Sequence, residues 1–194
     1  CSYKIYLAEF NEDKELEIMD TNEMNIDNKI LNNKIFTNNE QLIGVDPKLA
    51  ESLVESALKK NYFKILQNIK YYRREAKIGK SRFDFIGLDN ENKYFILEVK
   101  NVPLADYADV CASERKKMEK SNLFKDKKAH EKIAYFPDGY RKKKGDIVSE
   151  RALKHINELA EVTYSKIIRP IICFVIQRTD VSSFQASNLD PTYK

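Results

Sequence analysis

Apolar side chains recur along this chain at two different spacings. From 46 to 61 they return every three to four positions behind Asp46-Pro47, an acid and a proline that suit a helix N-terminus, so the pattern predicts a helix there. After residue 69 the pattern becomes that of β-strands. Three strands are predicted, over 69–78, 82–88 and 93–99. The third is apolar on both faces and should lie inside a sheet.

Short turns separate these strands. Gly79-Lys80 suits a two-residue hairpin loop, and a cluster of polar residues at 89–92 predicts the second turn. Beyond the strands we expect a long polar segment over 104–146 with a charged helix at 112–120. An amphipathic helix at 149–162, a strongly apolar strand at 167–177 and a loop-rich tail should follow.

The order helix, three-strand meander, helix, strand predicts an α/β sandwich with a mixed sheet. We assign 46–194 to this domain, with a lysine-rich insertion at about 104–134. Residues 1–45 contain a short strand and then a polar stretch, so we expect a β-rich appendage or a linker there.

The net charge is only +4, but it is unevenly distributed. Residues 112–144 hold twelve Lys and Arg against five Asp and Glu. Such a basic stripe is typical of proteins that bind phosphate backbones, although it also fits a solvated insertion. Three widely spaced cysteines and the lack of a long apolar stretch favour an intracellular, cytoplasmic protein that does not bind membranes.

The predicted turns bring acidic residues into register. A loop at 79–80 sets Glu75 opposite Asp84, and the next turn sets Asp84 opposite Glu98. Lys100 lies two residues beyond Glu98, on the same face. Clustered carboxylates repel one another, and a divalent cation such as Mg²⁺ or Mn²⁺, bound by Asp84 and Glu98, would relieve this. With Lys100 acting on water and phosphate, such a site suits phosphodiester hydrolysis.

A plainer interpretation remains open. Glu98 and Lys100 would form an ordinary ion pair at a strand end, and Asp84 would pair with Arg82 or Arg74. The protein would then be a metal-free structural or regulatory protein.

Several strings in order resemble the sugar fermentation stimulation protein family, SfsA. They are RREAKIGKSRFDFIG, EVKNV, FPD, VSERALKHINEL, FVIQRTDVSSF and DPTY, within 73–101, 135–138 and 148–193, with a weaker match over 42–60. The resemblance implies a DNA-binding protein linked to bacterial sugar use. It also implies an OB-fold domain followed by a restriction-endonuclease-like, PD-(D/E)xK domain.

On matching positions the resemblance assigns Asp84, Glu98 and Lys100 to the nuclease signature and Glu75 to a further acidic position. This chain departs from the family pattern in three ways. The OB-fold domain is reduced to a remnant within 1–45, a lysine-rich insertion separates EVKNV from FPD, and Pro103 replaces an expected threonine.

Basic side chains near the predicted site are candidates for contacts with nucleic acid. They are Arg74, Arg82, Arg151, Lys154, His155 and Arg178. We place His155 on the polar side of its helix with Arg151 and Lys154. This side could contact nucleic acid, or it could simply be a solvated helix face. For Arg178 the alternative is a charge pair with Asp180.

We therefore expect a Mg²⁺- or Mn²⁺-dependent, DNA-binding nuclease of the SfsA type, possessing a restriction-endonuclease-like core and able to form a homodimer. The alternative is a catalytically inactive DNA-binding regulatory module. Metal binding and cleavage of DNA separate these hypotheses from each other and from the metal-free alternative.

Overall fold

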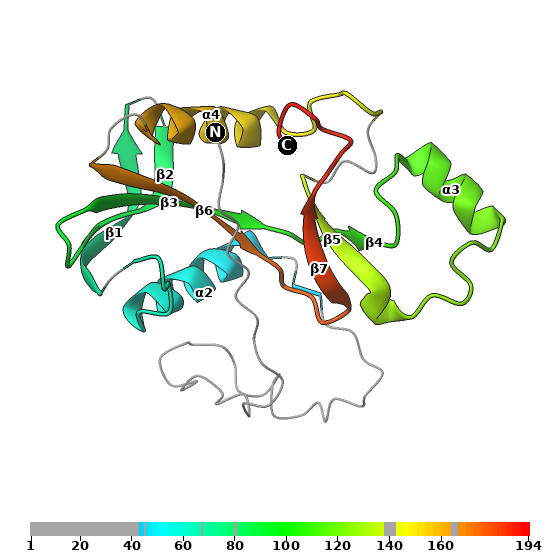
Figure 1. The fold of residues 1–194 in the computed structure, drawn as a ribbon, viewed down its shortest axis with the longest axis horizontal. Helices are drawn as coiled ribbons and strands as arrows, with labels where there is room; N and C mark the ends of the chain where they lie inside the picture. The colour runs from blue at the N-terminus through cyan, green and yellow to red at the C-terminus, as the bar shows by residue number, and fades with distance from the viewer. Residues whose placement is uncertain (1–42, 45, 67, 80, 138–142, 164–166) are drawn as a thin grey trace. The chain divides into compact units, whose positions relative to one another are not determined.

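Four strands form a mixed sheet that lies between two helices (Figure 1). The structure is a computed structural model that describes residues 43–44, 46–66, 68–79, 81–137, 143–163 and 167–194. The strands are β1 (Ile69–Ile78), β2 (Ser81–Asp89), β3 (Tyr94–Asn101) and β6 (Ile168–Val175), in the order β1-β2-β3-β6. The first three are antiparallel, and β6 runs parallel to β3. The expected α/β fold with a mixed sheet, and the inner position of the third strand, are confirmed.

The register of the meander also agrees with the prediction. Ile78 pairs with Ser81, and Leu88 pairs with Tyr94. Gly79 has a φ of +58°, a left-handed conformation that glycine adopts at little cost in the first turn. This register carries Asp84 towards the part of β3 that holds Glu98.

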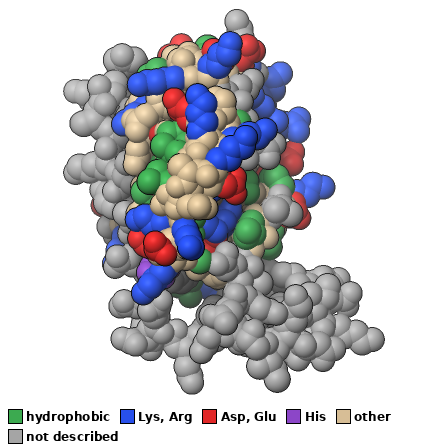
Figure 2. All heavy atoms as spheres, turned by 90° about the vertical axis from the view of Figure 1, so that its right-hand side faces the viewer, with side chains coloured by type: hydrophobic (Ala, Val, Ile, Leu, Met, Phe, Trp, Pro, Cys, Tyr) green, Lys and Arg blue, Asp and Glu red, His purple; other side chains and the backbone are tan. Residues whose placement is uncertain are grey.

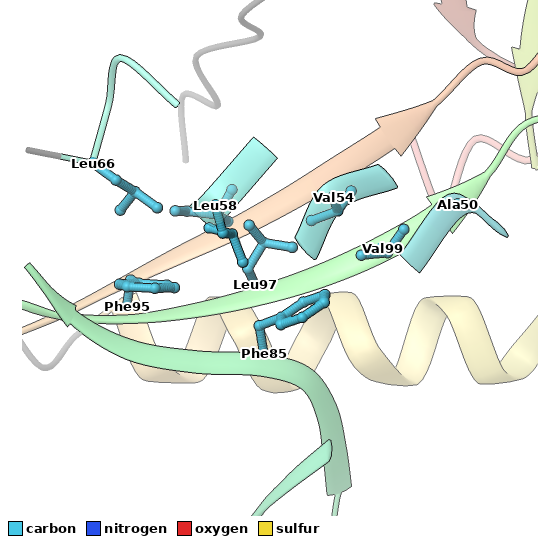
Figure 3. Close-up of a cluster of buried hydrophobic side chains, with 9 residues drawn as sticks. Ala50, Val54, Leu58, Leu66, Phe85, Phe95, Leu97 and Val99 are labelled. Carbon is cyan, nitrogen blue, oxygen red and sulfur yellow. The ribbon is translucent and has the colours of Figure 1, made fainter. Parts of the chain in front are cut away.

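One face of the sheet is covered by α2 (Pro47–Lys59). The helix begins as expected, because the Asp46 side chain accepts a hydrogen bond from the backbone N–H of Lys48 at 2.9 Å and proline occupies the first position. Figure 3 shows the buried cluster between α2 and the sheet. Its labelled members are Ala50, Val54, Leu58, Leu66, Phe85, Phe95, Leu97 and Val99.

The opposite face is covered by α4 (Glu150–Thr163), as Figures 1 and 3 show. Leu159 of α4 packs there with Phe83 and Ile96. A helix on each face makes both sides of β3 apolar, which explains its continuous hydrophobic sequence. Glu98 is therefore a charged residue in the most buried strand of the sheet.

A second sheet occupies sequence that we expected to be mostly irregular. It contains β4 (Ala105–Asp106), β5 (Lys132–Phe136) and β7 (Val181–Ala186), in the order β4-β5-β7. The prediction of a polar segment over 104–146 and a loop-rich tail was wrong here, because these strands are short and pair with distant sequence. The charged helix was predicted correctly as α3 (Ala112–Lys120), and a short 3-10 helix, Ala129–Glu131, precedes β5.

A buried carboxylate links the strands of this second sheet. Asp180 is 2% exposed and accepts hydrogen bonds from Lys132 Nζ at 2.7 Å and from Arg178 at 2.8 Å. These two cations hold the pKa of Asp180 down to about 2. Two cations thus neutralise one buried acid beside the junction of β5 and β7.

The predicted β-rich segment 1–45 lies almost wholly outside the described residues. Of this segment Ile43 forms an isolated antiparallel bridge with Arg178. Within the described part of the chain, no helix is long and apolar enough to cross a membrane.

Candidate active site

Glu98 is the centre of a buried polar cluster between β3 and α4. Its side chain is 4% exposed, and Oε1 accepts a hydrogen bond from Lys100 Nζ at 2.6 Å. Nδ1 of His155, from α4, contacts the same oxygen. The other oxygen, Oε2, is buried and has no hydrogen-bond partner among the residues that the structure describes. A buried carboxylate oxygen without a partner is costly, so Glu98 is only half satisfied by the protein itself.

Asp84 approaches this cluster from β2. Its Oδ2 accepts a hydrogen bond from the backbone N–H of Val99 at 2.6 Å, which ties it to the residue after Glu98. Burial is the main cause that raises the pKa of Asp84 to about 6. The negative charges of Glu98 and Glu51 act in the same direction, and the hydrogen bond from Val99 and the charge of Lys100 act against it. The structure thus brings together Asp84, Glu98 and Lys100.

The strand geometry at Asp84 is irregular. Residues two apart in a strand normally face the same side, yet Phe83 packs in the cluster under α4 and Phe85 in the cluster under α2. On the facing strand β1, Glu75 has a φ of +50°, which is unusual for a residue other than glycine. Local irregularities of this kind re-aim side chains beside functional sites.

Glu75 does not join the acidic cluster. Its side chain is 63% exposed and pairs with Arg82 Nη1 at 3.0 Å. The register places Glu75 opposite Asp84, as Arg74 pairs with Phe85 and Ala76 with Phe83. The Glu75 side chain nevertheless points to solvent, at a residue whose backbone has a positive φ. Strand register alone therefore does not decide which carboxylates lie together.

His155 lies in the cluster and not on the solvated face where the hydropathy pattern placed it. It is 6% exposed, and its ring lies 6.0 Å from the ring of Phe83. The buried side of α4 consists of Ala152, His155 and Leu159, spaced three and four residues apart. Because histidine counts as a polar residue in the hydropathy pattern, the prediction assigned His155 to the solvated face of the helix and not to the buried one.

The other basic candidates occupy two kinds of environment. Arg74 donates to Glu51 at 2.9 Å and to Glu55 at 2.8 Å. Arg178 binds Asp180 and the carbonyl oxygen of Pro103, and its side chain is 8% exposed. These are ion pairs within the fold. Arg82, Arg151 and Lys154 are exposed, with Lys154 lying 3.8 Å from Glu158.

The acidic pair on α2 was missed by sequence reasoning. Glu51 and Glu55 are four residues apart and therefore share one face of the helix, which is a readable signal. Both hold Arg74, and the charge of Glu51 also acts on Asp84. The negative charge around Asp84 thus comes from α2 as well as from the sheet.

A cavity of about 320 Å³ lies at the C-terminal end of β3. It is lined by Asn101, which follows Lys100, by Tyr135 of β5, and by Ser149, which precedes the helix that carries His155. Among the described residues, no three His, Cys, Asp or Glu side chains come close enough to hold a metal ion by themselves. Any cation at this cluster would take the rest of its ligands from water or a substrate.

The fold and the cluster together define an α/β protein with a half-satisfied, buried carboxylate beside a lysine. Comparison with known proteins identifies the group to which it belongs. The family model described as "Sugar fermentation stimulation protein RE domain" matches residues 48–113 and 120–194. The chain therefore belongs to the sugar fermentation stimulation protein (SfsA) family, and the resemblance inferred from its motifs is confirmed.

Individual relatives agree with this assignment. The sugar fermentation stimulation protein homolog of Clostridium novyi is 31% identical over 146 residues, which are 75% of this chain and 49% of the relative. That of Clostridium perfringens (strain 13 / Type A) is 32% identical over 156 residues, covering 79% and 53% of the two chains. The chain thus spans about half the length of the curated relatives it matches.

A solved structure has a similar fold. The structure of Pyrococcus furiosus SfsA in complex with Ca²⁺ superimposes with a TM-score of 0.52 and 20% sequence identity. The similarity covers 73% of this chain and 47% of that one.

Proposed function

We propose that this chain is a divalent-metal-dependent nuclease with a restriction-endonuclease-like, PD-(D/E)xK site that hydrolyses phosphodiester bonds in DNA. One observation carries the proposal. Asp84 is hydrogen-bonded to the residue after Glu98, Lys100 binds Glu98, and within the described part of the chain the buried Oε2 of Glu98 has no partner.

The donor set fits a hard divalent cation. Burial raises the pKa of Asp84, and among the described residues nothing binds Oε2 of Glu98, so a bound cation would stabilise the ionised form of both carboxylates. Mg²⁺ is often held by only one or two carboxylates, with waters and substrate phosphates completing its shell. Asp84 and Glu98 would supply these two carboxylates for Mg²⁺ or Mn²⁺. The Ca²⁺ named for the Pyrococcus furiosus relative, a cation with the same preference for oxygen ligands, supports this choice.

The surrounding residues have separable roles. His155 and Lys100 both bind Oε1 of Glu98, which leaves Oε2 as the oxygen available to a ligand. His155 therefore orients Glu98. Lys100, 12% exposed, places a positive charge where a phosphate and its attacking water would develop negative charge. A bound divalent cation would act there as a Lewis acid on the phosphoryl group.

A cleavage assay tests the proposal. Wild type, Asp84→Asn and Lys100→Met are compared on single-stranded DNA, double-stranded DNA and RNA with Mg²⁺ or Mn²⁺. Glu75→Gln is the matched control, because it removes a carboxylate of the same sheet that lies outside the cluster. We expect metal-dependent cutting of DNA that falls by about 10²-fold or more in the two cluster variants and persists in the control.

Two results would overturn the proposal. Cleavage that survives both cluster substitutions would place the activity elsewhere. If no nucleic acid is cut although the wild type binds DNA, the chain is a DNA-binding module without turnover.

A further inference from the structure

The α3 segment carries a concentration of exposed positive charge that the candidate active site does not use. Figure 2, which faces the α3 side of the fold, shows lysine and arginine side chains over much of this surface and fewer acidic ones. The exposed lysines here form what we call the lysine platform: Lys116, Lys117, Lys120, Lys125, Lys127 and Lys128. Three exposed acids lie among them, Glu114, Glu119 and Asp126.

Acidic side chains of the described residues neutralise little of the platform's charge. Lys127 pairs with Glu131 at 2.9 Å. In the described part of the chain, Lys116, Lys117 and Lys120 of α3 form no ion pair. The helix also buries no residue of its own, so packing does not explain why it is there. The family model leaves 114–119 unmatched, which sets this part of α3 apart from the shared core.

The platform is nevertheless held firmly by contacts at its base. Nε of Arg115 in α3 donates to the carboxylate of Asp106 in β4, with distances of 2.8 and 2.6 Å to its two oxygens. Its guanidinium lies 4.3 Å from the ring centre of Phe124, which stacks on Tyr107 at 5.4 Å. A partly buried arginine–carboxylate ion pair together with a cation–π contact holds the Arg115 side chain in one place, and with it this turn of α3. These contacts distinguish the platform from a loop that is merely solvated.

A second anchor ties the approach to α3 to the C-terminal sequence. Asp109 accepts hydrogen bonds from Ser187 Oγ at 2.8 Å and from the backbone N–H of Asn188 at 2.6 Å. Because these anchors fix the backbone of the segment before any partner binds, little backbone conformational entropy remains to be lost on binding.

We propose that the lysine platform is a second DNA-binding surface, which holds the phosphate backbone of a duplex whose scissile bond lies at the Asp84–Glu98–Lys100 cluster. The chain runs from Lys100 to Asp106, where the base of the platform begins, in six residues, at most about 20 Å even when fully extended. That span is about six base pairs at 3.4 Å each. The base of the platform therefore lies within the length of a short duplex from the cluster. This inference rests on the proposed function in taking DNA as the ligand.

Salt-dependent binding of the full chain tests the inference. The probe is a labelled DNA duplex of about 30 base pairs, with a chelator present so that nothing is cut. The platform variant combines Lys116→Gln, Lys117→Gln and Lys120→Gln. The control makes the same change in net charge at three exposed lysines by the end of α2, Lys59, Lys60 and Lys64.

Each phosphate contact contributes about 0.9 to the slope of log affinity against log salt concentration. We expect the platform variant to lower this slope by about 3 and to bind more weakly, and the control to bind as the wild type does. Equal effects in both variants would show that only net charge matters and would overturn the inference. So would binding to vesicles of anionic lipid without binding to the duplex.

The outcome is separable from that of the proposed function. Binding that depends on the platform, without cleavage, would retain the platform and reject the nuclease. Cleavage that depends on Asp84, with no effect of the platform variant on binding, would retain the nuclease and reject the platform.

Discussion

Replacing Asp84 with asparagine should make the metal-free protein more stable while removing the proposed nuclease activity. Burial raises the pKa of Asp84 from its ordinary value of 3.8 to about 6. The folded state therefore binds this proton more tightly than the unfolded state does. The native state is favoured most below pH 4, and stability falls as the pH rises towards 6. At 1.36 kcal/mol per pH unit the full effect would be about 3 kcal/mol.

Because Asp84 is only partly buried, screening by solvent reduces this to about 1–2 kcal/mol. Asparagine keeps an oxygen that can accept the hydrogen bond from Val99 but carries no charge. Asp84→Asn should therefore raise the free energy of unfolding by about 1–2 kcal/mol at pH 7 and change it little at pH 4. This is the trade between stability and function expected where a site holds uncompensated charge.

Urea unfolding of both proteins at pH 7 and pH 4, with a chelator present, measures this difference. The control Glu75→Gln removes an exposed carboxylate and should stay within about 0.5 kcal/mol of the wild type. Adding Mg²⁺ should stabilise the wild type and leave Asp84→Asn unchanged. A loss of stability in Asp84→Asn at pH 7, or an equal gain at both pH values, would refute the reasoning.

Three further predictions concern other parts of the fold. Asp180→Asn leaves two cations without their shared buried acid and should cost about 3–5 kcal/mol of unfolding free energy at pH 7. Since the pKa of Asp180 is lowered to about 2, its stabilisation in the wild type should disappear as the pH falls from 4 towards 2, which thermal unfolding at stepwise pH would detect. His155→Ala removes a partner of Glu98 and should reduce metal affinity or cleavage about 10- to 100-fold, with DNA binding unchanged in a filter assay. Gly87 of β2 lies against the ring of Phe95, so the methyl group of Gly87→Ala would clash with that ring and should cost about 1–3 kcal/mol in urea unfolding; an unchanged midpoint would contradict this close contact.

The central meander was predictable because local signals determine it. A glycine turn and a polar turn fix which residues of β1, β2 and β3 face one another. The second sheet lacked such signals. Its strand β5 has five residues inside a polar segment, and its parallel partner β7 lies some fifty positions away. Short strands that pair over such distances leave little trace in local periodicity.

The same contrast holds at the candidate site. Asp84, Glu98 and Lys100 could be brought together from sequence because their meeting follows from the hairpin register. The sequence did not reveal that the Glu75 side chain points to solvent, because a positive φ at a residue other than glycine leaves no sequence signal. The partnership of His155 with Glu98 depends on how α4 rotates on the sheet, which tertiary packing decides.

The central claim is that Asp84 and Glu98 hold a divalent cation, and Mn²⁺ binding followed by electron paramagnetic resonance tests it most directly. The signal of free Mn²⁺ should fall as wild-type protein is added, and it should fall equally with Glu75→Gln. It should remain with Glu98→Gln and with Asp84→Asn. Mn²⁺ binding that is undiminished by both cluster substitutions would contradict the account.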